Sequence, residues 1–538
     1  MPSRHHNCEC KKMSHTKYVQ GGAADNGNGS KFSPYNSLAT AQADPYWKTL
    51  IVLPSTISLE GNLILQDGQN LRGKVDPTKL GNNVVGTLTT LSGNTVTCLG
   101  NNKISYLRFE NIDHIAIKLT QAENVVISKV HITKFNLGNY FEFSFWESGA
   151  IQGFQNTKSG TITVKDSVIE YGTCGIQLSV AGSAVRKLNA CNNIVRNLTA
   201  ELICIGIGGA ATENGIIHDN YSHNYLENLQ TQTYGAGLWG TSSHLILIPG
   251  DNDYRPGGTL FADWKYNTLQ NMGNTISNFG FWSLFLVNEG TSNTVTWDIF
   301  NNYMNRGDQA TLFQLNISDF EPGTPETGAT VNINFKKNRI DKHAYGYVHY
   351  AGTIENVIIE DNTFNDLNVA IDFLALNDNG SIVFAKIINN EANQLSEEFL
   401  GLYNDEGFWK KLSIEMDKNC ITDAAIGVAD YTDNLLNKNI KVVGRNNGFS
   451  NVPVSVSRNP GDAVMDLRSN YWGGGPANVV VNGVGQGSVD VSNYLTVNPC
   501  PHPIYQFQVK RLEQVENKDK LEPKTSYGWA ALKIKYSN

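Results

Sequence analysis

The sequence predicts an all-β solenoid, in which short strands coil through successive turns that stack on one another. Three observations predict this fold. A phrase made of a β-rich run, an Asn, any residue and an apolar residue recurs at least ten times in the 538 residues. The copies follow one another at 23 to 47 residues, and a period near 25 is what one solenoid turn requires, with insertions where a gap exceeds 28. Gly, Asn and Asp separate the strand-like runs, without helical spacing.

The recurrent Asn marks one corner of each turn. Asn tolerates a left-handed backbone and allows a sharp bend, and stacked Asn amides can hydrogen-bond along the axis as a ladder. We therefore interpret the row as structural, with Val130 and Ser167 in the matching place in two earlier copies. The expected ladder consists of Asn192, Asn220, Asn267, Asn302, Asn338, Asn362, Asn390, Asn419, Asn447 and Asn470.

A second apolar run follows each corner, as in GIQLSV (175–180), AIDFLA (370–375) and AIGVAD (425–430). One turn cannot bury its inward row of side chains alone. Stacking the turns about 4.8 Å apart pairs every strand with the turns above and below, and closes a continuous core. We expect about a dozen such turns.

Passages at both ends of the repeat resemble a known superfamily. The opening YVQGGAADNGNGSKFSPYNSLATAQ, followed by TLIVLPS and by LQDGQNLRG (65–73), is similar to its N-terminal cap and first turn. SNYWGGGP (469–476) resembles its last turn. Over residues 18–498 the chain therefore resembles the right-handed parallel β-helix proteins, the pectin-lyase-like superfamily. The resemblance implies a right-handed parallel β-helix but little chemistry, because this fold carries lyases, hydrolases, epimerases, adhesins and phage tailspikes.

Four parts are expected along the chain. A flexible tail (1–17) precedes a cap with the first turns (18–99), in which residues 33–48 supply a capping helix. The β-helix covers 100–498, and residues 499–538 form a C-terminal cap or attachment tail. A cap is the simpler interpretation of this tail, and dimerisation or partner binding is the alternative. Insertions leave the β-helix at about 136–158, 229–262, 272–293 and 305–329.

Composition and charge narrow the classes of function. The chain has 42 Lys and Arg against 50 Asp and Glu, and no basic block between residues 40 and 500, which argues against a nucleic-acid partner. No stretch of 18 apolar residues occurs, and the polar start lacks an apolar signal region. We therefore expect no membrane insertion and no Sec export. A cytoplasmically made protein of a particle or virion fits this start, and export by another route is the alternative.

Eight cysteines are few for this length. Cys174, Cys191, Cys204 and Cys420 lie in apolar runs, so we expect them to be reduced and buried. The Cys/His segment at 5–10 lacks the separated ligand pairs of a zinc module, so a metal site there is the less favoured interpretation.

The four insertions are rich in Trp, Tyr, Phe and Gly. Gathered on one flank, their aromatic faces could wall a groove that holds sugar rings. The alternative is that these side chains only pack the loops onto the rod. The candidate ligand-binding residues are Trp146, Trp239, Tyr254 and Trp282.

Paired carboxylates are missing from the sequence pattern. Hydrolases that resemble polygalacturonases use two or three carboxylates from adjacent turns, and the motifs of that family are absent. The outward row of the second strands is expected to hold one carboxylate, Asp372, in the series Lys118, Gln152, Gln177, Gly206, Asp372, Gly401, Gly427 and Ser455. One carboxylate cannot act as acid and base at once, so we expect hydrolysis to be weak or absent.

The longest insertion holds the other candidate cluster, in SSHLILIPGDNDYRPGG. Asp251 and Asp253 could bind calcium or place a carboxylate near a substrate, although a turn is the simpler interpretation. No cofactor is required, and calcium is the candidate metal. Besides Asp372, the candidate catalytic residues are His244, Asp251, Asp253, Arg255, Glu147 and Glu289.

Two functions compete on this evidence from the sequence. The favoured one is a surface or particle-associated β-helix protein with a structural and glycan-binding role, able to form a homo-oligomer through its C-terminal tail. The alternative is a polysaccharide lyase or glycoside hydrolase acting on an acidic or neutral polysaccharide. A pair of carboxylates on the groove side of the rod would favour the second function.

Overall fold

The structure is a computed structural model, and its described residues fall into two compact units divided near Ala262. The first unit holds the elements from β1 to β22, the second holds those from β24 to β45, and β23 (Thr259–Lys265) spans the division. The described residues are 15–24, 27–79, 84–136, 149–200, 203–211, 214–231, 235–241, 258–272, 281–282, 285–287, 294–311, 314–316, 330–351, 354–375, 380–404, 407–432, 436–437, 439–458, 463–482 and 487–500.

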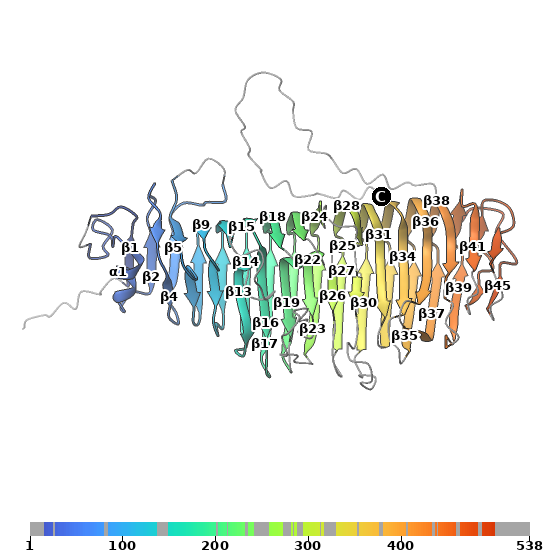
Figure 1. Ribbon diagram of the computed structural model, residues 1–538, viewed down its shortest axis with the longest axis horizontal. Coiled ribbons are helices and arrows are strands. Elements are labelled where there is room, and N and C mark those ends of the chain that lie inside the picture. The colour runs from blue at the N-terminus through green and yellow to red at the C-terminus, as the bar shows by residue number, and fades with distance from the viewer. Residues whose placement is uncertain are drawn as a thin grey trace, which may run out of the picture. The chain divides into compact units, whose positions relative to one another are not determined.

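Each unit is a right-handed parallel β-helix, as the sequence predicts. Along the chain, each strand of a first sheet is followed by one or two strands of a second sheet, and strands of adjacent turns pair in parallel (Figure 1). A right-handed coil is the preferred connection between parallel strands of one sheet. Whether residues 100–498 form one uninterrupted β-helix stays a prediction.

The first unit contains these elements. Its first sheet comprises β1 (Thr16–Val19), β2 (Thr49–Val52), β5 (Asn70–Gly73), β8 (Asn102–Ser105), β11 (Val125–Ser128), β14 (Gly160–Lys165), β17 (Val185–Cys191) and β20 (Ile216–Ser222). Its second sheet comprises β3 (Leu59–Glu60), β4 (Leu63–Leu65), β6 (Thr87–Thr90), β7 (Val96–Cys98), β9 (Arg108–Ile112), β10 (Ile117–Leu119), β12 (His131–Phe135), β13 (Gly149–Asn156), β15 (Val168–Gly172), β16 (Cys174–Val180), β18 (Ile194–Ala200), β19 (Ile203–Ala211), β21 (Tyr225–Thr231) and β22 (Gly235–Thr241).

The second unit repeats this plan. Its first sheet comprises β27 (Thr294–Phe300), β30 (Thr330–Lys336), β32 (Ile354–Glu360), β35 (Ser381–Ile388), β37 (Trp409–Asp417), β39 (Ile440–Arg445), β42 (Val464–Asp466) and β45 (Ser488–Asp490). Its second sheet comprises β24 (Thr268–Gln270), β25 (Phe281–Trp282), β26 (Phe285–Val287), β28 (Tyr303–Thr311), β29 (Gln314–Asn316), β31 (Arg339–Ala351), β33 (Thr363–Leu367), β34 (Val369–Ala375), β36 (Glu391–Asn404), β38 (Cys420–Asp430), β40 (Gly448–Ser450), β41 (Val454–Arg458), β43 (Tyr471–Trp472) and β44 (Val479–Val481).

The N-terminal cap contains a helix shorter than the predicted 33–48. α1 (Leu38–Ala43) begins after Ser37, whose hydroxyl accepts a hydrogen bond from the Thr40 amide at 3.1 Å. It ends at Asp44 because this residue precedes Pro45, and a following proline disfavours helical backbone. No helix among the described residues is long and apolar enough to cross a membrane.

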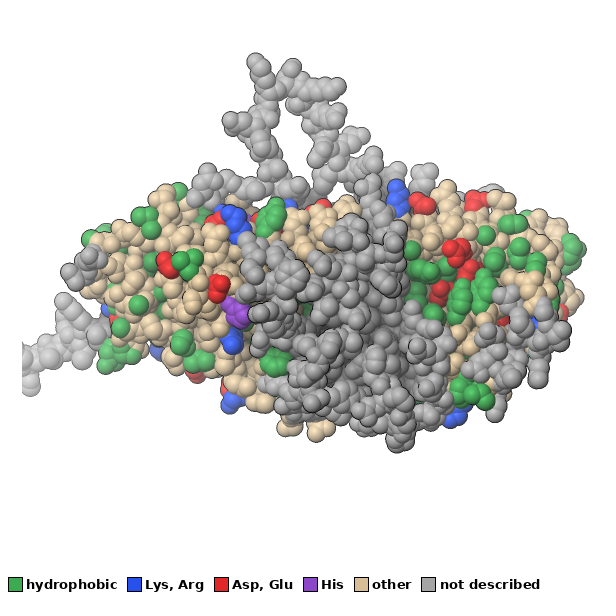
Figure 2. Space-filling model, in the orientation of Figure 1, with side chains coloured by type: hydrophobic (Ala, Val, Ile, Leu, Met, Phe, Trp, Pro, Cys, Tyr) green, Lys and Arg blue, Asp and Glu red, His purple; other side chains and the backbone are tan. Residues whose placement is uncertain are grey.

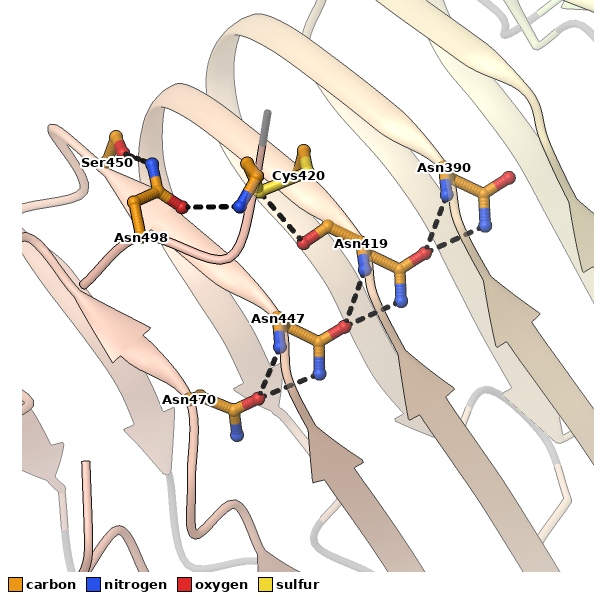
Figure 3. The surroundings of a disulfide bond; sticks show 8 residues. Asn390, Asn419, Cys420, Asn447, Ser450, Asn470 and Asn498 are labelled. Carbon is orange, nitrogen blue, oxygen red and sulfur yellow. Dashed lines mark hydrogen bonds between the residues drawn. A yellow bond between two sulfur atoms is a disulfide. The ribbon is translucent and has the colours of Figure 1, made fainter. Parts of the chain in front are cut away.

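The Asn ladder runs along the turn corners of both units. In the second unit each ladder Asn before Asn470 donates its backbone and side-chain N–H groups to the Oδ1 of the next ladder Asn, as Asn390 does to Asn419 at 3.0 and 2.9 Å. Figure 3 shows four of these stacked amides, from Asn390 to Asn470. In the first unit, Val130 donates to the Ser167 hydroxyl at 3.3 Å.

Two predicted ladder positions in the first unit are wrong. Asn193 and Asn224 form the ladder, with the Asn193 amide 3.1 Å from the Asn224 Oδ1, whereas Asn192 and Asn220 lie outside it. The sequence phrase is ambiguous there because Asn192 and Asn193 are adjacent, and Asn220 lies within β20.

The left-handed backbone lies one residue before the ladder Asn, not at the Asn itself as the sequence pattern predicts. The residue before each ladder Asn has the positive φ, for example Asp361 at 57°, Asn389 at 54° and Lys418 at 55°. The ladder Asn itself is buried and uses its amide for hydrogen bonds, so the bend does not require it to adopt this conformation. Lys or Asp occupies this position in some turns and Asn in others, so no single residue type marks it in the sequence.

Inward side chains of adjacent turns stack into a buried core in each unit. In the second unit one such row continues from turn to turn and ends in the ring stack of Phe449 on Trp472, with centroids 4.4 Å apart. The row consists of Ile340, Phe364, Ala392, Ile421, Phe449 and Trp472, none of them more than 7% exposed.

One cysteine prediction is wrong. Cys174 and Cys204 are buried thiols and Cys191 is a half-buried thiol, but Cys420 forms a disulfide with Cys500 (Figure 3). Cys420 opens a strand on the outside of the turn, where the chain returns after the last strand. The two cysteines are 80 residues apart in sequence, so the apolar run around Cys420 gave no sign of the partner.

Candidate functional site

Most of the residues proposed from the insertions lie outside the described residues. These are Trp146, Glu147, His244, Asp251, Asp253, Tyr254, Arg255 and Glu289. The backbone of Trp239 lies in β22 and that of Trp282 in β25, and neither side chain is described. The glycan groove and the calcium site therefore stay predictions. Among the described residues no group of three or more His, Cys, Asp or Glu could hold a metal ion.

Asp372 is the catalytic candidate that the structure describes. It lies on the outward row of β34, paired with Val348 of β31 and with Gly401 of β36. Figure 1 shows β31, β34, β36 and β38 side by side in the second unit. The Asp372 side chain is only 4% exposed, although it points away from the apolar core. Because buried polar groups are normally hydrogen-bonded, the residues around Asp372 must account for its burial.

In other turns, the predicted outward row of the second strands differs by two residues from the observed strand pairing. Gly401 pairs with Ala429 rather than Gly427, and Ala429 pairs with Ser457 rather than Ser455. In the first unit Gln177 pairs with Gly208 in place of Gly206. A shift of two residues keeps the same face of a strand, so alternation alone could not reveal the error.

Because Gly401 has no side chain, the carboxyl groups of Asp372 and Glu398 can approach each other beside it. A Cβ at this glycine would lie 2.3 Å from Oδ1 of Asp372 and 3.0 Å from Oε1 of Glu398. The two oxygens are therefore no more than about 5.3 Å apart, the sum of these distances. Glu398 is 1% exposed, so both carboxyl groups are withdrawn from solvent.

Glu398 is the functional candidate that the sequence pattern missed. The segment from the ladder residue Asn390 to Gly401 is one residue longer than the matching segment of the preceding turn, from Asn362 to Asp372. The pairing of β36 with β38 shifts its register between Leu395 and Glu398. Strict alternation does not follow a side chain through such an irregularity. The extra residue, next to the consecutive acids Glu397 and Glu398, is the signal that could have revealed the second carboxylate.

Two tyrosines complete the site. The Tyr403 hydroxyl donates a hydrogen bond to the Glu398 carboxylate, and the Tyr403 and Tyr431 rings stack with centroids 4.6 Å apart. Both tyrosines are half-buried. Figure 2 shows acidic and hydrophobic side chains together over the region of β34 and β36. Asp372, Glu398, Tyr403 and Tyr431 are called the carboxyl–tyrosine cluster below.

Burial controls the protonation of this cluster. Burial raises the pKa of Asp372 well above its ordinary value of 3.8, and the neighbouring charges of Glu398 and Glu397 raise it further. Burial also raises the pKa of Glu398, although the Tyr403 hydroxyl opposes the shift by bonding to the carboxylate. Two acids this close cannot easily ionise together, so the pair keeps one proton over a pH range in which isolated carboxyls are ionised.

The hydrogen bonds assign that proton. The Oδ1 of Asp372 is buried and has no hydrogen-bond partner among the described residues, which favours the neutral acid at this position. Glu398 accepts from a phenol, which favours the carboxylate. Burial and nearby acidic groups raise the pKa of Tyr431 to about 12, so its hydroxyl stays protonated at neutral pH. The hydrogen bonding therefore favours Asp372 as the neutral acid and Glu398 as the carboxylate, with the tyrosine hydroxyls as donors.

Comparison with known proteins gives distant structural likeness. The catalytic unit of a thermostable GH87 alpha-1,3-glucanase from Streptomyces thermodiastaticus strain HF3-3 is 11% identical, with 89% of this chain and 69% of that chain covered and a TM-score of 0.37. The GH136 lacto-N-biosidase from Eubacterium ramulus is 8% identical, covering 87% and 68%, with a TM-score of 0.28. Tailspike protein 3 of bacteriophage CBA120 is 9% identical, covering 89% and 62%, with a TM-score of 0.27.

No family model and no curated protein matches the chain. At these identities and TM-scores the structural likeness assigns neither a family nor an activity. The function must be argued from the side chains of the carboxyl–tyrosine cluster.

Proposed function

We propose that the protein binds a glycan at the carboxyl–tyrosine cluster and hydrolyses a glycosidic bond there. One observation carries the proposal: Asp372 and Glu398, from adjacent turns, converge on the space above Gly401 with oxygens no more than about 5.3 Å apart. Glycoside hydrolysis uses two carboxyl groups at short separation, one as acid and one as carboxylate. The expectation of weak or absent hydrolysis rested on finding a single carboxylate, and Glu398 removes that premise.

The protonation states assign the two roles. Asp372 is the neutral acid and gives its proton to the glycosidic oxygen as the bond from that oxygen to the anomeric carbon breaks. Glu398 is the carboxylate and bonds to the anomeric carbon, because two carboxyl groups this close leave no room for a water between them and the sugar. Water then cleaves that bond with Asp372 as its base, so the hydroxyl of the water ends on the anomeric carbon and its proton restores the Asp372 acid.

The tyrosines supply the binding surface. Stacked, half-buried rings present an apolar face beside polar groups, which suits a sugar ring with its C–H face and its hydroxyls. The Tyr403 hydroxyl also fixes the Glu398 carboxylate, because it donates to it. A glycan-binding role without turnover is the second candidate, and these same rings favour it.

Hydrolysis of a neutral oligosaccharide panel tests the proposal. The panel contains α- and β-linked glucan, galactan, mannan and chitin oligosaccharides, and mass spectrometry detects the products. We expect at least one to be cleaved, and Asp372→Asn and Glu398→Gln to reduce cleavage by about 100-fold or more. Asn matches the neutral Asp372 acid in shape and charge, so this variant should fold.

The control is Asp423→Asn, at an exposed position with φ of 58° that Asn tolerates. It should cleave as the unchanged protein does. Cleavage that survives both carboxyl substitutions contradicts the assignment. No cleavage, combined with glycan binding that Tyr403→Ala abolishes, would replace hydrolysis by the binding role.

A further inference from the structure

The charges around the cluster bear on which sugars it accepts. Glu397 precedes Glu398 in β36 and is exposed, while its backbone amide bonds to the Asn368 carbonyl at 2.9 Å. Three acidic side chains thus come from two adjacent turns at one place on the second sheet. Among the described residues none of the three forms an ion pair with Lys, Arg or His.

The acidic side chains also raise the pKa values of neighbouring tyrosines. The charges of Asp372, Glu397 and Glu398 raise the pKa of Tyr345, after its burial, and those of Glu398, Asp372 and Glu397 do the same for Tyr431. Among the described residues, no cation shifts the pKa of Asp372 or Glu398. A ligand at the stacked rings therefore meets the negative charges of Glu398 and Glu397, which no positive side chain in the described part of the cluster offsets.

The buried Oδ1 of Asp372 indicates what the ligand supplies. This oxygen has no hydrogen-bond partner among the described residues, and it lies over Gly401 beside the Tyr403 ring. A sugar hydroxyl or glycosidic oxygen next to the Asp372 carboxyl would hydrogen-bond to it without adding charge. A carboxylate of an acidic sugar would bring a further negative charge to the same place.

We propose that the cluster selects uncharged sugars and rejects uronic acids, with the exposed Glu397 as the specificity-determining charge. This inference rests on the proposed function, because it concerns the same site. It narrows the sequence-based expectation of an acidic or neutral polysaccharide to the neutral class. One charge placed about 6 Å from another, at an effective dielectric near 20, weakens binding by on the order of 100-fold.

Matched oligosaccharides test the selection. The probes are hexasaccharides of glucose, galactose and mannose, α- and β-linked, each prepared as the C6 alcohol, the C6 carboxylate and the methyl ester of that carboxylate. Binding is measured by calorimetry and cleavage by mass spectrometry. For the sugar that is accepted, we expect the alcohol and the ester to bind and the carboxylate to bind about 100-fold more weakly.

Two variants separate this charge effect from the shape of the site. Glu397→Gln should narrow the ratio between ester and carboxylate by about tenfold or more, and raising the salt should narrow it in the same direction. Glu415→Gln removes an equal charge at a side chain that is 65% exposed elsewhere on the unit, and should leave the ratio unchanged.

The outcomes distinguish the two proposals. A carboxylate probe that binds as well as its methyl ester overturns the selection and leaves the glycan site standing. A preference that Glu397→Gln does not reduce contradicts the role of Glu397. If none of the three forms of any sugar is bound or cleaved, the proposed function fails and the selection fails with it.

Discussion

Removing one amide from the buried ladder should destabilise the second unit strongly. The Asn419 side chain makes four hydrogen bonds, two accepted from Asn390 at 3.0 and 2.9 Å and two donated to Ile387 and Asn447 at 2.8 Å. Asn419→Ala removes all four and leaves the buried Asn390 amide without its acceptor. At about 1 kcal/mol for each bond, we expect the free energy of unfolding to fall by about 3 to 5 kcal/mol.

The assay combines urea unfolding with hydrogen exchange. Trp409 is fully buried in the same unit, so its fluorescence reports loss of this core, and exchange measured on peptides containing Asn390 reports local opening. The control is Asn356→Ala, which removes an exposed Asn–Asn bond of 3.1 Å to Asn332 between adjacent turns. It should change stability by less than about 0.5 kcal/mol. Equal effects of the two substitutions would refute the account of the ladder as a structural element.

Three further substitutions are expected to have specific effects. Burial raises the pKa of Asp219 to about 8, so as pH rises the unfolded chain loses this proton before the folded chain does. The free energy of unfolding should therefore fall by on the order of 5 kcal/mol between about pH 4 and pH 8. In Asp219→Asn, thermal unfolding should show no such fall from this position. Cys500→Ser opens the link to Cys420 across 80 residues, and should lower stability by about 4 kcal/mol, an effect absent when both proteins are compared under reductant. Gly401→Ala places a methyl group 2.3 Å from Oδ1 of Asp372, and should abolish glycan cleavage while costing about 1 to 3 kcal/mol in urea unfolding.

The fold was predictable because each turn repeats the same solution to the same packing problem. An Asn that bonds to the next Asn and an apolar inward row must recur in every turn, so Asn362, Asn390, Asn419 and Asn447 stand out in the sequence. The prediction failed where the phrase allowed two alignments, as at Asn192 and Asn193. It also missed the disulfide, which joins segments that no local pattern connects.

The site was predictable only in part. Asp372 followed from strand alternation, and its pairing with Gly401 was placed correctly. Glu398 did not follow, because its side chain reaches the site through an irregular stretch of β36 rather than from the strand row. The stacking of Tyr403 on Tyr431 is a contact between turns, and it depends on a register that the sequence pattern misjudged by two residues at Ala429.

The pH dependence of glycan cleavage tests the central claim most directly. The claim is that Asp372 acts as the neutral acid and Glu398 as the carboxylate of one pair. The rate of the unchanged protein should rise with pH as Glu398 loses its proton and fall as Asp372 loses its own, and both limbs should lie above the pKa of ordinary carboxyls. In the residual activity of the variants, Asp372→Asn should lose the fall at high pH and Glu398→Gln the rise at low pH. A profile in which both limbs survive either substitution would contradict the claim.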